Sequence, residues 1–256
     1  MDAVRLAVGT FTLFPVSPPR RVEASTWRAA ITLAPVVGVV LGLVSWVAGR
    51  AMQEATGSVF VAAVFVVVAL AVLTRGLHLD GLADVADGLG SRRPPRDAQA
   101  VMRQSDVGPF GVVTLVLTLL VQVAVLQVAF AWSDPYACAV TVTASALVSR
   151  AALVLTCRRG VPPAADGMGA HVVGSVSRAV ASLVAGAALV VVVVAGLAVE
   201  SELALWLAIA ALGALAVAEL WWRHCAQRLG AVTGDVLGSL EQLNWTTFLV
   251  VAVLLV

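Results

Sequence analysis

Three aspartates lie within eight residues in the stretch GLHLDGLADVADGLG, which covers residues 76–90. On a helix, Asp80, Asp84 and Asp87 have the spacing i, i+4, i+7 and therefore share one face. Like charges at this spacing repel one another, and a bound divalent cation would turn that repulsion into attraction. Carboxylate oxygens are hard ligands that suit Mg²⁺. The pattern predicts a metal site formed by these three aspartates, and the alternative is a solvated acidic helix face.

A second polar stretch, RQSDVGPFG, covers residues 103–111 and precedes an apolar run. It places Arg103 and Asp106 just before a glycine-proline turn. An arginine and a carboxylate at the start of a helix suit a phosphate group and a metal ion. The alternative is a helix cap, because Ser105 or Asp106 would serve as one.

A third stretch, RLGAVTGDVLGSLEQ, covers residues 228–242 and combines glycines with a hydroxyl and acids. Thr233, Gly234 and Asp235 suit a contact to a phosphate or a ribose, and Glu241 follows them. The alternative is a glycine-rich turn between two helices, which would need the same residue types without any ligand.

Two further residues are candidates for substrate binding. Arg150 lies about seven residues inside an apolar run, which is roughly 10 Å deep in a helix. It either faces the aspartates and binds phosphate or extends its head to the membrane surface. Gly81 flanks the aspartates, and its missing side chain would let a phosphate or another helix come close.

Together these residues predict a metal-assisted site for a phosphorylated or diphosphate substrate, and transfer of a phosphoryl-linked group fits best. The chain contains no lysine and hence no Walker loop. A cation transporter is the alternative from another class, with acids and Arg150 forming a pathway. The aspartates, however, follow an apolar run instead of lying inside one.

The composition shows what must position these residues. Hydrophobic residues make up 61% of the chain and charged residues 12%, against about 25% charged in a soluble domain. The mean hydropathy is +0.99. We therefore expect an all-α, polytopic membrane helical bundle with about six or seven transmembrane helices, formed by one domain over residues 1–256. The apolar runs cover about 30–49, 57–73, 108–131, 137–157, 179–199, 203–220 and 243–256, and the shorter run 6–16 is expected at the interface.

Arginines are unevenly distributed between the segments that join these runs. If the N-terminus is cytoplasmic, every arginine except Arg50 and Arg150 lies in a cytoplasmic segment. Those segments are 1–29, 74–107, 158–178 and 221–242. Cytoplasmic loops of membrane proteins carry an excess of positive charge. We therefore expect the N-terminus and the active site to face the cytoplasm.

The polar stretches also resemble a known family. GLHLDGLADVADGLGS, RQSDVGPFGVV, SRAALVLTC, DGMGAHV and AVTGDVLGSLEQ occur in the order expected of adenosylcobinamide-GDP ribazoletransferases, also called cobalamin synthases. TLFPVSPP and LAPVVGVVLG near the N-terminus are similar to the opening pattern of that family. The likeness extends over nearly the whole chain, and LDGLADVADG is its most specific part.

The resemblance implies a polytopic enzyme of the bacterial inner membrane that uses Mg²⁺. Members join GDP-activated adenosylcobinamide to α-ribazole or its 5′-phosphate, and they release GMP. The implied partners are these substrates and the lipid bilayer, with no nucleic acid, and a homo-oligomer remains possible. The acceptor's phosphorylation state and its base are left open.

Site residues follow from the same resemblance. Asp80, Asp84 and Asp87 correspond to the metal and diphosphate site, Asp106 to a second acidic motif, and Thr233, Gly234 and Asp235 to a third. We expect Asp87, or else Asp106, to accept the proton of the attacking hydroxyl, and Arg103 or Arg150 to stabilise the leaving GMP.

Two other membrane transferase families also use aspartates, and the chain departs from both patterns. CDP-alcohol phosphotransferases have a D-G-x-x-A-R opening followed by spaced aspartates, whereas DGLAD at 80–84 continues differently. Membrane prenyltransferases prefer N-D-x-x-D-x-x-x-D, which does not occur here.

Overall fold

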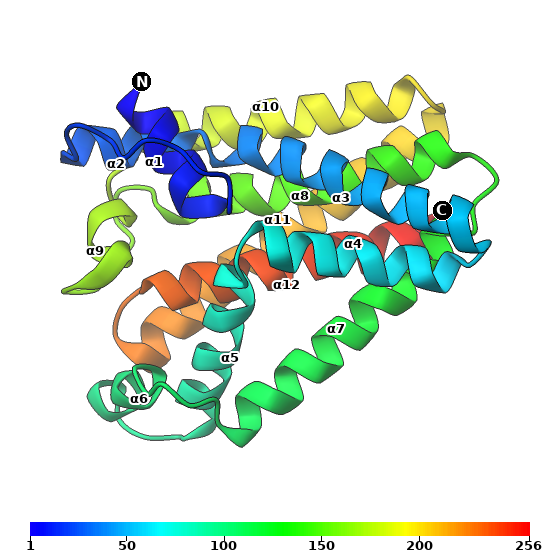
Figure 1. Cartoon of the computed structure of the whole chain (residues 1–256). Helices are drawn as coiled ribbons and strands as arrows, with labels where there is room; N and C mark the ends of the chain where they lie inside the picture. Colours follow the sequence, from blue (N-terminus) through cyan, green and yellow to red (C-terminus); the bar gives the residue numbers. More distant parts are fainter.

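The computed structural model describes all 256 residues as twelve α-helices without a β-strand (Figure 1). Six helices are long and apolar enough to cross a membrane. The predicted all-α, polytopic bundle is therefore confirmed. These helices are α3 (Ala34–Thr56), α7 (Pro109–Phe130), α8 (Pro135–Thr156), α10 (Arg178–Leu197), α11 (Ser201–Leu229) and α12 (Gly234–Leu255).

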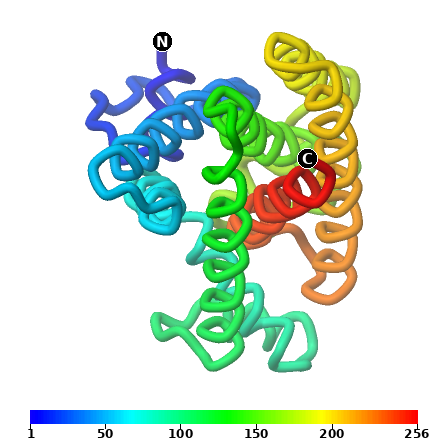
Figure 2. The backbone as a smooth tube through the Cα atoms, turned by 90° about the vertical axis from the view of Figure 1, so that its right-hand side faces the viewer, coloured from blue at the N-terminus to red at the C-terminus, as the bar shows by residue number.

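Helix α8 is the centre of the bundle, because 78% of the residues in its apolar stretch are buried. Helices α3, α10, α11 and α12 all pack against it, as the view along the bundle shows (Figure 2). Small residues allow this close packing. A side chain at Gly42 of α3 would come within 2.9 Å of the Thr143 Cα on α8, which is typical of helix contacts in membranes.

A sharp elbow separates α4 (Val59–Leu73) from α5 (Leu77–Gly90), and the two helices meet at 90°. Arg75 and Gly76 form the elbow with left-handed φ angles of 55° and 69°, a conformation that suits glycine but strains arginine. The Arg75 guanidinium donates hydrogen bonds to the Gly9 and Thr10 carbonyl oxygens, which fixes it in place. The aspartate-bearing α5 consequently turns away from the direction of the crossing helices.

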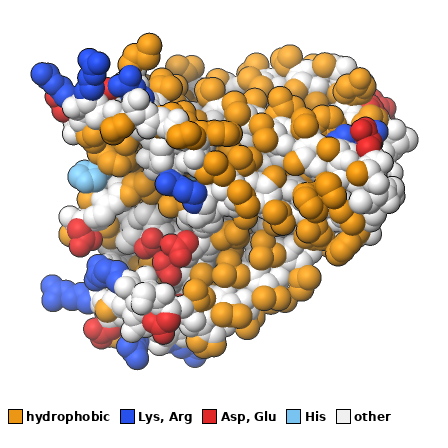
Figure 3. Space-filling model, viewed as in Figure 1, with side chains coloured by type: hydrophobic (Ala, Val, Ile, Leu, Met, Phe, Trp, Pro, Cys, Tyr) orange, Lys and Arg blue, Asp and Glu red, His pale blue; other side chains and the backbone are white.

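The remaining helices are short and gather at one end of the bundle. They are α1 (Asp2–Phe11), α2 (Ala24–Thr32), α6 (Pro95–Met102) and α9 (Gly167–Val172). Most charged side chains visible in Figure 3 cluster at that same end, and hydrophobic side chains cover the rest of the visible face. We call this end, formed by α1, α2, α5, α6 and α9, the polar end.

The last crossing helix begins earlier than the sequence suggested. The segment 221–242 was expected to be a loop, but α11 continues to Leu229 and α12 begins at Gly234. The Thr233 hydroxyl accepts the Val236 N–H and so caps α12. Polar residues of α12 find partners within the bundle; the buried Asn244 amide, for example, donates to the Ala214 carbonyl at 2.8 Å. The final span is therefore 22 residues long instead of a marginal run from 243 to 256.

Candidate active site

A cavity of about 500 Å³ opens at the polar end between α5, α6, α9 and the start of α12. Five predicted site residues from separate stretches of the chain meet there: Asp80, Arg103, Thr233, Gly234 and Asp235. Leu77, Gln99, Met102, Asp166, Gly167 and Met168 complete its wall. We call it the acidic cavity, because it carries three carboxylates and one guanidinium.

Asp84 lies one helical turn beyond Asp80 and is half-buried. Burial, followed by the nearby carboxylates of Asp80, Asp235 and Asp87, raises the pKa of its carboxyl to about 7. No arginine or histidine forms an ion pair with Asp80, Asp84 or Asp235. These three carboxylates therefore have no ion-pair partner, and Arg103 is the one cationic side chain in the wall of the cavity.

The acidic cavity suits a divalent cation only together with a substrate. No three acidic, histidine or cysteine side chains are placed to hold a metal ion by themselves. Mg²⁺ commonly takes one or two protein carboxylates and completes its shell with water and substrate phosphates. Asp80, Asp84 and Asp235 offer such oxygens, without ion-pair partners, beside a cavity large enough for a diphosphate.

The carboxylate of Asp87 makes a contact that the sequence did not predict. Its carboxylate accepts the N–H groups of Gly108 at 2.7 Å and Gly111 at 2.9 Å, and the residue is only 7% exposed. These amides belong to the start of α7, where a negative charge also complements the helix dipole. Asp87 therefore caps α7 from α5, in place of Ser105 or Asp106. Capping is a positioning role that the sequence did not predict, and the metal-binding and catalytic roles expected of Asp87 stay predictions.

Replacing Asp87 with alanine should destabilise the protein whether or not a divalent ion is present. Two charge-assisted hydrogen bonds to α7 would be lost, at a cost of roughly 2–4 kcal/mol. Thermal unfolding of the purified protein in detergent measures this loss. The matched control is Asp97→Ala, since Asp97 is an exposed acid on α6 outside the acidic cavity. Equal stability of the two variants would contradict the capping role.

Arg150 does not reach the acidic cavity. It is 2% exposed and forms a buried ion pair with Glu241 of α12. The Ser149 hydroxyl donates to the same Glu241 oxygen at 3.0 Å, and the His78 ring lies 3.4 Å from the other. Its predicted phosphate-binding role is thus not supported, and neither is the alternative of a head extended to the surface. A buried arginine is stable here because a carboxylate balances its charge.

Gly81 serves helix packing. A side chain there would lie 2.7 Å from the Asp235 carbonyl oxygen, so only glycine lets α5 approach the start of α12 this closely. Of the two uses expected for this glycine, a close helix contact is the one observed. The contact brings the helices that carry Asp80 and Asp235 together at the acidic cavity.

Gly81→Ala should therefore cost both stability and activity, because the backbone it meets cannot move aside as a flexible side chain would. We expect a loss of roughly 1–3 kcal/mol from overpacking. Gly213→Ala is the matched control, since a side chain at that helical glycine meets nothing within 4 Å. Thermal unfolding should show the control unchanged or slightly stabilised. A Gly81 variant as stable and active as the control would show that the close contact is dispensable.

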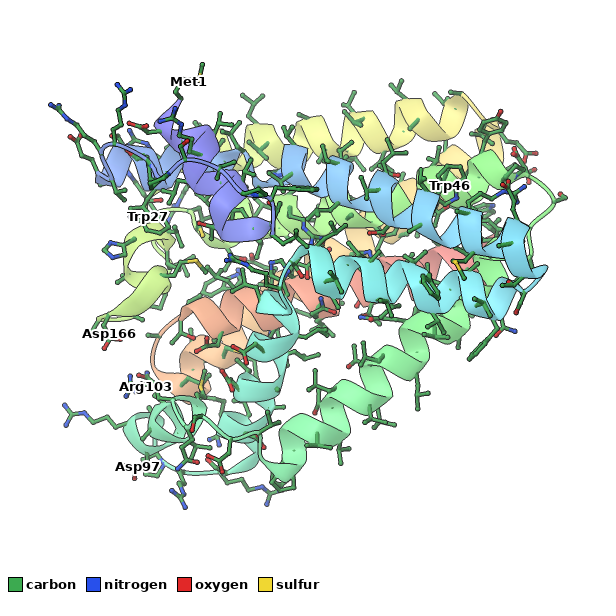
Figure 4. The ribbon with its side chains drawn as sticks, in the orientation of Figure 1. Met1, Trp27, Trp46, Asp97, Arg103 and Asp166 are labelled. Carbon is green, nitrogen blue, oxygen red and sulfur yellow. The ribbon has the colours of Figure 1, made fainter.

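Two further acids, Asp106 and Asp166, differ in whether they line the acidic cavity. Asp106 is exposed on the loop between α6 and α7 and does not line the acidic cavity. Asp166 lines it and lies 4.0 Å from the Arg103 guanidinium, and Figure 4 shows both residues at the polar end. Asp166 was not predicted as a site residue, although the stretch DGMGAHV that begins with it was noted.

A narrow apolar cavity of about 20 Å³ adjoins the acidic one. The two share Leu77, Met168 and Gly234 in their walls. Phe11 and Trp27 line the apolar side, and Trp27 stacks on His171 of α9 with ring centroids 5.3 Å apart. Apolar and aromatic surface therefore lies directly beside the charged groups.

Fold and site together define a class: a polytopic membrane protein with an acidic cavity, supported by an arginine and a helix start, at one end of its bundle. Such a cavity suits phosphate groups accompanied by a cation. The chain belongs to the cobalamin-5-phosphate synthase family, whose model matches residues 3–253.

Curated relatives agree with this family over almost their whole length. An adenosylcobinamide-GDP ribazoletransferase of Nocardioides sp. is 40% identical over 94% of this chain and 94% of its own. The protein of that name in Frankia casuarinae is 34% identical over 98% of this chain and 94% of its own. The protein of that name in Mesorhizobium japonicum is 32% identical over 98% of this chain and 93% of its own length. No solved structure matches the chain.

Proposed function

We propose that this protein is an adenosylcobinamide-GDP ribazoletransferase, which joins GDP-activated adenosylcobinamide to α-ribazole or its 5′-phosphate and releases GMP. The family and the names of its relatives support this activity. The structural observation that carries it is the acidic cavity, in which Asp80, Asp235 and Arg103 meet from three separate stretches of the chain.

The protein groups around this cavity suit a diphosphate. Arg103 would hold one phosphate, and the Thr233 hydroxyl and the first N–H groups of α12 would contact another. One or two of the carboxylates of Asp80, Asp84 and Asp235 would hold Mg²⁺ together with the substrate phosphates, and the ion would neutralise charge on the diphosphate. Alignment of the two substrates by these fixed groups supplies much of the acceleration expected for such a transfer.

The transfer exchanges one phosphorus–oxygen bond for another. The acceptor hydroxyl oxygen bonds to the phosphorus that carries the cobinamide, and the bond from that phosphorus to the bridging oxygen breaks. GMP leaves with the bonding electrons, and its charge is stabilised by Arg103. The hydroxyl proton passes to a carboxylate. Of the two predicted acceptors, Asp87 is held by the amides of α7 and Asp106 lies on a loop outside the acidic cavity, so we propose that a carboxylate lining the cavity takes the proton.

We further propose that the polar end faces the cytoplasm of a bacterial inner membrane. Every arginine except Arg50, which lies in α3, and Arg150, which lies in α8, belongs to a segment at that end. Positive charge favours the cytoplasmic side. The soluble, charged substrates would then enter the acidic cavity without crossing the membrane.

Product analysis tests the proposed function. Purified protein in liposomes receives GDP-activated cobinamide, α-ribazole and Mg²⁺, and mass spectrometry follows the corrinoid and the nucleotide. We expect a corrinoid in which ribazole has replaced the GMP portion of the activated substrate, together with an equal amount of free GMP. Release of CMP or pyrophosphate from other activated substrates, or Mg²⁺ flux without a new corrinoid, would instead support a different transferase or a transporter.

A further inference from the structure

A second cavity at the polar end has the opposite charge. It has a volume of about 490 Å³ and lies between α2 and the start of α10, apart from the acidic cavity. Arg28 of α2 and Arg159 of the segment after α8 line it, and no acidic residue does. Neither arginine forms an ion pair anywhere in the structure. We call it the basic cavity.

Hydroxyls and backbone groups support an anion in this cavity. Thr32, Ser175 and Ser177 lie in its wall. Ser177 caps α10, a helix of 20 residues whose first N–H groups therefore begin at the cavity. A helix start and two guanidinium groups from separate elements favour a phosphate group. The reaction proposed for the acidic cavity uses neither Arg28 nor Arg159.

Apolar residues form another part of the wall of the basic cavity. Ala29, Leu33 and Val180 form part of its wall. Along α10 the apolar surface continues, with Val180 40% exposed and Leu183 72% exposed. A ligand that fits has an anionic phosphate head and acyl chains that follow the crossing helix, as basic pockets between membrane helices bind acidic lipids.

We propose that the basic cavity binds the headgroup of an anionic phospholipid, with Arg28 and Arg159 contacting its phosphodiester. The site would anchor α2 and α10 at the membrane surface. This inference needs no substrate and does not depend on the proposed transferase activity, so the two fail separately.

Native mass spectrometry of the full chain in detergent, titrated with phosphatidylglycerol or phosphatidylcholine, tests the proposal. We expect preferential binding of phosphatidylglycerol. The double variant Arg28→Gln/Arg159→Gln should weaken it by roughly fivefold for each arginine removed. Arg92→Gln/Arg93→Gln is the matched control, because these exposed arginines also form no ion pair and line neither cavity. Equal loss in both double variants, or no lipid preference, would overturn the proposal.

Photocrosslinking of a lipid and displacement of the lipid by phosphate are two further tests of the site. A photoactivatable phosphatidylglycerol should crosslink to peptides from α2 and the start of α10, and crosslinks found only elsewhere would contradict the site. Inorganic phosphate at matched concentration should not displace the lipid. Displacement that depends on the same two arginines would instead assign the cavity to a free phosphate.

Discussion

Replacement of Asp84 by asparagine is expected to reduce turnover strongly without lowering the thermal stability of the protein. Asp84 sits among three other carboxylates, and its pKa is raised to about 7, first by burial and then by those neighbours. Above the ordinary pKa near 4 the unfolded chain releases this proton more readily than the folded one. Stability should therefore fall as the pH rises from about 4 through 7, and asparagine removes that loss.

The activity of the Asp84→Asn variant, unlike its stability, should fall. If Asp84 helps to hold a cation on the substrate diphosphate, its loss should reduce GMP release on the order of 10²–10³-fold, as losing one group that stabilises transition-state charge does. GMP release is assayed at pH 8 with Mg²⁺ present, and thermal unfolding is measured at pH 8 without divalent ions. Both measurements compare the variant with Asp97→Asn. An Asp84→Asn variant that unfolds at a lower temperature than the control, or that keeps near-normal turnover with Mg²⁺ present, would refute the role given to this residue.

Replacement of Glu241 by glutamine is expected to have the largest effect on stability. Its carboxylate balances the buried Arg150 guanidinium and also accepts hydrogen bonds from Ser149 and Gln242. Removing one partner of a buried ion pair leaves an uncompensated charge, which costs about 3–5 kcal/mol. Thermal unfolding in detergent, read by the loss of monodisperse protein, measures the effect.

A double variant separates the ion pair from mere packing. Arg150→Met together with Glu241→Gln should be more stable than Glu241→Gln alone, because the orphaned charge is gone. Glu202→Gln at the exposed start of α11 serves as the control and should change stability by less than about 0.5 kcal/mol. Additive losses in the double variant would argue against coupling between Arg150 and Glu241.

Much of the architecture follows from local sequence. The apolar runs predicted the crossing helices, because any unpaired backbone group in lipid is costly and a helix pairs them all. The spacing of Asp80 and Asp84 correctly placed them on a helix outside those runs. Polar stretches far apart in the chain were predicted to serve one site, and Asp80, Arg103 and Asp235 do line one cavity.

Where the structure differs from the expectations, the cause is a polar side chain whose charge or hydrogen bonds are met by a residue distant in the sequence. Arg150 was expected either to bind phosphate or to extend its head to the membrane surface, yet Glu241 balances its charge across the bundle. Asp87 has the spacing of Asp80 and Asp84, and local spacing could not show that its carboxylate also caps the distant α7. Glu241 and its neighbours suggested a loop, although buried partners let α12 continue through them. Such pairings depend on how helices pack, which local spacing does not encode.

The central claim is that a divalent ion and the substrate diphosphate meet in the acidic cavity. Electron–nuclear double resonance on protein loaded with Mn²⁺ and GDP-activated cobinamide tests it directly, because coupling of the manganese spin to phosphorus requires the two to be in contact. We predict phosphorus coupling that is lost in Asp80→Asn and Asp235→Asn and kept in Asp97→Asn. Coupling that survives in all three variants, or that never appears in the unaltered protein, would contradict the account.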